Sequence, residues 1–221
     1  MSTPFTAQLE NSYERRVLLA VELLDAVTLT RVSEGVKVIA EGLQGKPIIN
    51  SSGCFVWIIE NNATIQKLSV EPGVQPYEPH KLDGLQVKKP LTTIELQPTV
   101  DYPFAPGITG LRGTLIERNT TPREPVAGAE VRLRWLDDNG NWNDTPTVSK
   151  TREKSGDFVS ILRLAPKEKP VIDANGAVTV RLQITRNGST RSSNNLSLLQ
   201  GRITDPTVLN PLTFAWDELQ P

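Results

Sequence analysis

The sequence predicts an all-β protein built from two tandem β-sandwich domains that a proline-rich linker joins. Two observations predict the all-β class: 17 prolines and 15 glycines interrupt the 221 residues at short intervals, and the apolar runs between them are brief and often β-branched. A third observation, a set of short motifs that occurs twice in the same order, predicts the two domains. We therefore expect many short strands joined by turns, in two similar arrangements.

The first half contains the apolar runs expected of strands. The run VLLAVELL at 17–24 is rich in leucine, which also suits a helix, but the turn-rich DAVTLTRVSEG and the alternating VKVIAEG follow it. We interpret 17–24 as the first strand. Apolar and polar residues alternate imperfectly around Ile65, Leu68 and Val70 in ATIQKLSV at 63–70, which predicts another strand.

Alternation is cleaner in the second half, where AEVRLRWL occupies 129–136 and AVTVRLQI occupies 177–184. Residues two apart along a strand face the same side of a sheet. The side chains expected to face the core are Val131, Leu133 and either Trp135 or Leu136 in the first run, and Val178, Val180, Leu182 and Ile184 in the second. Each run is thus predicted to be a strand with one buried face.

Two Asn-Gly pairs predict hairpin turns. Asn139-Gly140, in LDDNGNWND, suits the two positive-φ positions of a type I′ turn. Asn187-Gly188 lies in TRNGSTRSS, which is basic and also suits phosphate binding. Because no aromatic residue adjoins this segment and the chain is slightly acidic, a second hairpin turn is the favoured interpretation.

Three prolines, Pro98, Pro103 and Pro106, fall close together in PTVDYPFAPG. Proline fixes φ, removes a hydrogen-bond donor and pushes the residue before it toward extended conformations, so this segment should be neither a helix nor a central strand. We interpret 99–107 as a stiff linker. It divides the chain into a flexible N-terminal segment (1–14), a first β-sandwich domain (15–98) and a second one (108–221).

Four motifs appear in both predicted domains in the same order. The pairs are RVSEGVKV (31–38) with EPVAGAEVRL (124–133), SSGCFVW (51–57) with KSGDFVS (154–160), ATIQKLSVEPG (63–73) with AVTVRLQITRNG (177–188), and PLTTIELQP (90–98) with PLTFAWDELQP (211–221). One match is easily a coincidence, whereas four in one order favour a duplicated fold. The last pair is predicted to form the closing strand of each sandwich.

A pattern of small and apolar residues in the second half matches that of a known family. It reads Pro-Val-x-Gly-Ala-x-Val-x-Leu and later Gly-x-Phe, and its residues are Pro125, Val126, Gly128, Ala129, Val131, Leu133, Gly156 and Phe158. This pattern resembles that of the carboxypeptidase-regulatory-like (transthyretin-like) family of Ig-like β-sandwiches. The resemblance is clearest in 108–221 and looser in the first half, where Ser33-Glu34 adds a residue before Gly35. It implies a non-catalytic module and, for an unexported chain, a component of a phage-tail-like contractile injection particle.

Composition argues against several classes of function. Lys and Arg total 24 and Asp and Glu total 25, so no positive field favours nucleic acid as a partner. The single cysteine, Cys54, cannot form an internal disulfide, and the single histidine, His80, cannot supply a multi-histidine metal site. No run approaches the roughly 20 apolar residues of a spanning helix, and no signal peptide is recognisable. We expect a cytoplasmic chain, free or within a large particle, without direct membrane insertion.

The sequence offers little catalytic or metal-binding chemistry. Cys54 and His80 are the conceivable nucleophile and base, but Cys54 lies between apolar neighbours, as structural thiols do. Asp137 begins the oxygen-rich run DDNGNWND, but an EF-hand loop needs Gly and Glu where Trp142 and Val148 stand. We therefore predict no catalytic residues, no cofactor and no metal, and leave weak or irregular ion binding at 137–144 as an alternative.

Trp142, Asn141 and Tyr77 are predicted to form an interaction surface, because Trp142 is the only tryptophan expected near the surface. The leading interpretation is a non-enzymatic structural or adaptor protein that binds other proteins of a multi-subunit assembly. A carbohydrate-binding module is the alternative, and it requires Trp142 and Tyr77 on one exposed face. A transthyretin-like hydrolase needs several histidines, whereas this chain has only His80. Self-association into homo-oligomers stays open.

Overall fold

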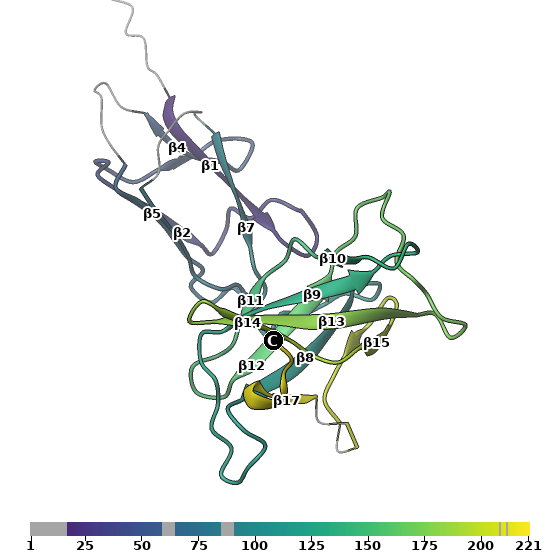
Figure 1. Ribbon diagram of the computed structural model, residues 1–221. Coiled ribbons are helices and arrows are strands. Elements are labelled where there is room, and N and C mark those ends of the chain that lie inside the picture. The colour runs from purple at the N-terminus through teal and green to yellow at the C-terminus, as the bar shows by residue number, and fades with distance from the viewer. Residues whose placement is uncertain (1–16, 59–64, 85–90, 208, 211) are drawn as a thin grey trace, which may run out of the picture.

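The computed structural model describes residues 17–58, 65–84, 91–207, 209–210 and 212–221 (Figure 1). The predicted flexible segment 1–14 lies outside these residues. The described part contains seventeen strands and one short 3-10 helix, η1 (Trp216–Glu218), so the all-β prediction is confirmed. Because η1 is three residues long, no helix in the described ranges is able to cross a membrane.

The N-terminal half forms two sheets around one cluster of buried side chains. One sheet has the order β3-β4-β1-β7 and the other β2-β5-β6. The strands are β1 (Val17–Asp25), β2 (Lys37–Glu41), β3 (Ile48–Ile49), β4 (Phe55–Ile58), β5 (Lys67–Glu71), β6 (His80–Asp83) and β7 (Leu91–Leu96). Every second residue of β1 from Leu19 on is buried, which confirms that the leucine-rich run is a strand.

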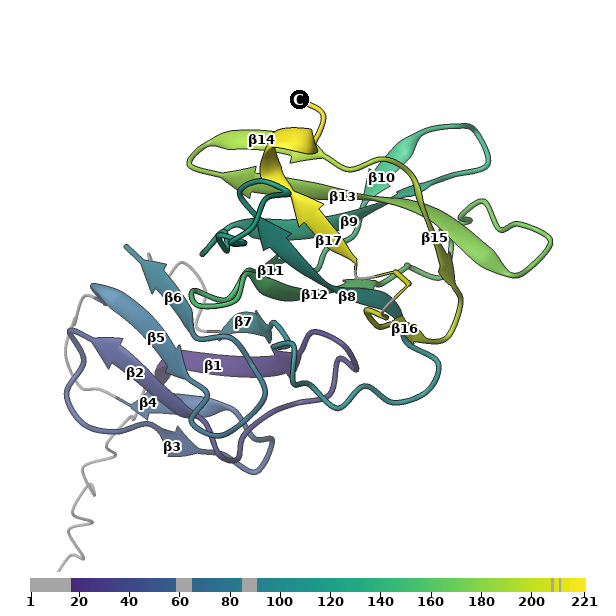
Figure 2. The same ribbon diagram turned by 90° about the horizontal axis from the view of Figure 1, so that it is seen from below.

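The C-terminal half packs a second pair of sheets around a separate cluster. The strands are β8 (Thr109–Ile116), β9 (Glu130–Leu136), β10 (Trp142–Asp144), β11 (Ser149–Lys150), β12 (Asp157–Leu162), β13 (Ala177–Arg186), β14 (Ser189–Ser192), β15 (Leu196–Leu199), β16 (Ile203–Thr204) and β17 (Thr213–Ala215). One sheet runs β10-β9-β13-β14, with β11 on β9 and β15 on β13; the other runs β12-β8-β16, with β17 on β8. Figures 1 and 2 show the two halves as adjacent bodies.

The inward-facing positions predicted for 129–136 and 177–184 are confirmed. Val131, Leu133 and the four residues of β13 that were predicted to face the core are fully buried between the sheets, together with Phe158 of β12. Trp135 rather than Leu136 faces this core. Full burial of one such side chain stabilises the fold by about 1.5 to 3 kcal/mol, so the core accounts for much of the stability.

Strand pairing repeats between the two halves. The strand β1 lies antiparallel to β4 and parallel to β7, while β8 lies antiparallel to β12 and parallel to β17. In the opposite sheets, β2 pairs antiparallel with β5 and β9 pairs antiparallel with β13. The predicted closing strands are confirmed, because each lies beside the first strand of its own half. The collinear motifs therefore occupy equivalent places in two similar arrangements.

The turn type predicted at Asn139-Gly140 is wrong. The strands β9 and β10 do form an antiparallel hairpin, but only Gly140 has a positive φ (83°). The Asp137 N–H donates to the Asn141 carbonyl oxygen (2.9 Å), which leaves a three-residue loop at 138–140 instead. The Asp137 carboxylate accepts hydrogen bonds from the backbone N–H groups of Asn139 (3.0 Å) and Asn141 (2.7 Å) and so stabilises this loop. The two-residue turn with two positive φ values is the one at Asn187-Gly188, where β13 and β14 form the other predicted hairpin.

The segment predicted as a linker contains no strand and packs against both of its neighbours. Tyr102 is buried, and its ring lies 4.7 Å from that of Phe104. Arg112 of β8 lies over the Phe104 ring and donates hydrogen bonds to the carbonyl oxygens of Val100 (2.8 Å) and Tyr102 (3.1 Å). These contacts hold segment 99–104 against the first strand of the C-terminal half.

Candidate functional site

A cleft of about 1350 Å³ lies where the two halves meet. One wall is segment 72–81, which leads into β6; the other is segment 148–153, which contains β11. Residues of β7 and of segment 97–103, together with Gly128 and Glu130, line the rest of the cleft. Most of the wall is loop or strand edge, so the shape of the cleft depends on how firmly the halves are held together.

Asp25, at the end of β1, anchors one side of this junction. It is only 4% exposed, and its Oδ1 accepts hydrogen bonds from the backbone N–H groups of Val27 (2.6 Å) and Thr28 (3.2 Å). Its Oδ2 accepts hydrogen bonds from the hydroxyls of Tyr77 (3.0 Å) and Tyr102. Burial and the nearby carboxylate both raise the pKa values of these tyrosines far above the ordinary value. One carboxylate thus holds the cleft wall and the connecting segment on β1.

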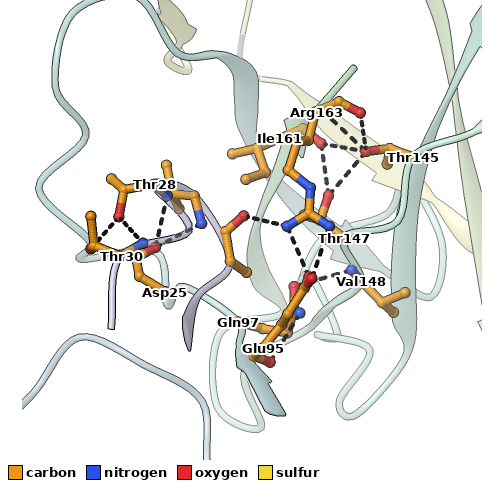
Figure 3. Close-up of polar contacts among 12 residues, drawn as sticks. Asp25, Thr28, Thr30, Glu95, Gln97, Thr145, Thr147, Val148, Ile161 and Arg163 are labelled. Atoms are coloured by element: carbon orange, nitrogen blue, oxygen red, sulfur yellow. Dashed lines mark hydrogen bonds and ion pairs between the residues drawn. The ribbon is translucent and has the colours of Figure 1, made fainter. Parts of the chain in front are cut away.

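Arg163, just after β12, joins the halves directly (Figure 3). Its Nη1 donates to the carbonyl oxygen of Ala26 (3.0 Å) and lies 2.8 Å from the Glu95 carboxylate. Its Nη2 donates to the other Glu95 oxygen at 3.1 Å, which makes the pair bidentate. A further bond crosses the junction, from the backbone N–H of Val148 to the side-chain oxygen of Gln97 (3.2 Å).

Arg163→Met is expected to lower the free energy of unfolding by about 1 to 3 kcal/mol, because it leaves Glu95 partly buried without its partner. The methionine keeps the apolar stem of the side chain, so packing changes little. Chemical denaturation followed by tryptophan fluorescence measures the loss. Arg118→Met is the control: that side chain is 75% exposed and 3.9 Å from Asp217, so the change should have almost no effect.

Neither a scan of protein-family models nor a search of the curated proteins finds a match to this chain. The resemblance of the second half to the carboxypeptidase-regulatory-like family therefore stays a prediction.

Half-buried and exposed charged groups line the cleft on both sides. Burial raises the pKa of Glu78, and the positive charges of Arg152 and Lys150 from the opposite wall partly offset this effect. Burial also lowers the pKa of His80, and Lys150 lowers it further. Arg152 forms an ion pair with Asp101. The cleft therefore has oppositely charged groups facing each other across a partly desolvated space.

His80→Gln is expected to reduce the loss of stability on acidification. The pKa of His80 is lower in the folded state than its ordinary value of 6.5. Between these two pKa values the imidazole is therefore protonated in the unfolded chain and neutral in the folded chain. Stability due to His80 is present above about pH 6.5 and falls as the pH falls below it. Thermal unfolding at several pH values checks this, and a variant that loses as much stability as the parent chain would refute it.

The structure separates the three residues predicted to form an interaction surface. Tyr77 lines the cleft and uses its hydroxyl to bind Asp25. Trp142 and Asn141 lie in the β9–β10 hairpin, outside the residues that line the cleft. Trp142 is half-buried, and the Arg181 guanidinium lies 4.2 Å from the centre of its ring. This arrangement gives the carbohydrate-binding alternative no support. Trp216 is also half-buried, so Trp142 is not the only tryptophan near the surface.

The residues considered for catalysis, metal binding and phosphate binding have structural roles instead. Cys54 is 8% exposed beside the core of the N-terminal half. The Asp137 carboxylate is occupied by the turn, and its hydrogen bonds to Asn141 lower its pKa. Within the described ranges, no group of three His, Cys, Asp or Glu residues is placed to hold a metal ion. Arg186 pairs with Glu117, and Arg191 stacks on Trp216, so neither basic residue of the second hairpin is positioned as a phosphate ligand.

Proposed function

We propose that this protein is a non-enzymatic structural or adaptor component of a larger protein assembly, and that it docks a partner protein in the cleft. One observation carries the proposal: the cleft walls come from two halves that Arg163 and Asp25 hold in a fixed arrangement. A wall held by buried polar contacts keeps its shape before a partner arrives, which reduces the entropy cost of binding.

The lining of the cleft suits a protein partner. Val74 is 97% exposed at its rim, and Val148 and several prolines lie along its walls among charged side chains. Apolar contacts bordered by charged groups are typical of protein interfaces.

Strand edges offer a second means of docking. In the described residues, β6 is the outer strand of its sheet and pairs only with β5, and β11 pairs only with β9. Residues of both strands line the cleft. Edges of this kind bind an extended partner segment through backbone hydrogen bonds. The partner is therefore proposed to present an extended segment.

The resemblance noted in the second half supports a phage-tail-like contractile injection particle as the assembly. The partner is then a subunit of the sheath, tube or baseplate. In a native lysate, the chain should elute in a large complex, and Val74→Asp should shift it to its monomer size. Leu209→Asp, at a position 98% exposed and outside the cleft lining, should leave the complex intact. Elution of the parent chain alone at monomer size would overturn the proposal.

A further inference from the structure

Three arginines occupy the outer face of the sheet formed by β10, β9 and β13. Leu133 and Leu182 point from β9 and β13 into the core, so the residues that alternate with them face outward. Arg132 and Arg134 therefore face outward from β9, and Arg181 does so from β13. The register places Arg181 directly opposite Arg134. We call these three residues the arginine face.

The centre of the arginine face has one carboxylate for three guanidinium groups. Asp144 of β10 accepts a hydrogen bond from Nε of Arg134 (2.7 Å) and another from Arg132 (3.3 Å). Among the described residues, Arg181 forms no ion pair, and its Nε donates to the side-chain oxygen of Asn195 (2.7 Å). A second carboxylate, Glu130, lies at the end of β9 that borders the cleft. The centre thus keeps an excess of positive charge.

The guanidinium groups of Arg134 and Arg181 are held in place although they repel each other. Like charges directly opposite on neighbouring strands destabilise a sheet. The Arg181 guanidinium lies 4.2 Å from the centre of the Trp142 ring, and Arg134 donates to the carbonyl oxygen of Trp142 (2.9 Å). An arginine has five N–H donors, and within the described part of the chain Arg181 uses only the one at Nε for a hydrogen bond. Its two terminal nitrogens are therefore available to a bidentate anion.

We propose that the arginine face binds an acidic, carboxylate-rich segment of a partner protein. This inference depends on the proposed adaptor function and adds the chemistry of the partner. Arg181 and Arg134 would each donate to an incoming carboxylate, which relieves the repulsion between them. Charge complementarity of this kind determines which partners bind and how fast they associate.

The positive charge of the arginine face also suits the binding of nucleic acid, but two observations favour a protein. The ring of Trp142 is covered by Arg181, so no base is able to stack on that side of it. The whole chain has 24 basic and 25 acidic residues, and Asp144 lies within the face, so no long basic stripe is available to follow a phosphate backbone. An extended acidic segment needs only the few donors that the face provides.

The test is fluorescence anisotropy with the full chain and a short labelled peptide of alternating glutamate and glycine, at low and physiological salt. The double variant Arg134→Gln/Arg181→Gln should weaken binding by at least about tenfold, because two charge-assisted contacts are lost. The control Arg118→Gln/Arg123→Gln removes two exposed arginines elsewhere in the C-terminal half and should bind as the parent chain does. Circular dichroism checks that each variant is folded.

Three outcomes would overturn the inference: no binding of the glutamate peptide, equal weakening in both double variants, or single-stranded DNA of equal charge binding at least as tightly through the same two arginines. The glutamine version of the peptide should not bind. If the peptide fails while the chain still elutes in a large complex that Val74→Asp disrupts, the proposed function stands and the acidic partner is wrong.

Discussion

Asp25→Ala is expected to lower the free energy of unfolding by about 3 to 5 kcal/mol. The change leaves the hydroxyls of Tyr77 and Tyr102 and two backbone N–H groups in the junction without their acceptor. A buried or partly buried donor without a partner costs free energy, and here four donors lose their acceptor together. Denaturation by urea, followed by tryptophan fluorescence, measures the loss.

Matched variants separate this effect from a general loss of packing. Tyr77→Phe and Tyr102→Phe each remove one bond to Asp25 and should cost about 1 to 1.5 kcal/mol. Glu34→Ala, at an exposed carboxylate of the same half, should stay within about 0.5 kcal/mol of the parent. If Asp25→Ala costs no more than one of the tyrosine variants, Asp25 does not organise the junction as described.

Gly156→Ala is expected to destabilise the C-terminal half by about 3 kcal/mol or more. Gly156 has a φ of 72°, and a Cβ there would collide with the backbone carbonyl oxygen of Leu115. The collision is difficult to relieve because the Leu115 N–H donates to the Gly156 carbonyl oxygen at 2.9 Å. The free-energy cost of the positive φ and that of the backbone clash therefore add at the point where β12 meets β8.

The equivalent glycine of the first half provides the control. Gly53 has a φ of 77°, but the nearest atom to an added Cβ is Cδ of Arg31, at 3.0 Å on a flexible side chain. Gly53→Ala should therefore lower the free energy of unfolding by only about 1 to 2 kcal/mol, which is the cost of placing a residue other than glycine at this φ. Thermal unfolding of both variants gives the comparison, and equal losses would contradict the close contact described at Gly156.

Local sequence patterns predicted the strands well, because a strand with one buried face alternates apolar and polar residues along the chain. The runs at 129–136 and 177–184 show this period, and the structure buries the predicted residues. The motif repeat also predicted that 90–98 and 211–221 form equivalent closing strands, although nothing in the motifs indicates that β7 and β17 run parallel to β1 and β8. The direction of a strand relative to its neighbour depends on how the chain crosses between the sheets, and short motifs contain no information about these crossings.

The residues that build the candidate site were not predictable in the same way. Asp25, Gln97 and Arg163 are single polar residues in unremarkable local contexts, and only the fold brings them to one junction. A weak signal existed, since Asp25 ends a strand whose other inward positions are apolar. At Asn139-Gly140 the dipeptide was misleading because Asp137 binds the backbone of the loop and selects another turn.

Site-specific photo-crosslinking tests the central claim, that the cleft docks a protein partner, most directly. A photoreactive amino acid at position 74 on the cleft rim, and in a second sample at position 209 outside it, reports what lies against each site in native lysate. We predict that position 74 forms a single crosslinked adduct with another protein and that position 209 does not. An adduct of equal yield at both positions, or none at position 74, would contradict the account.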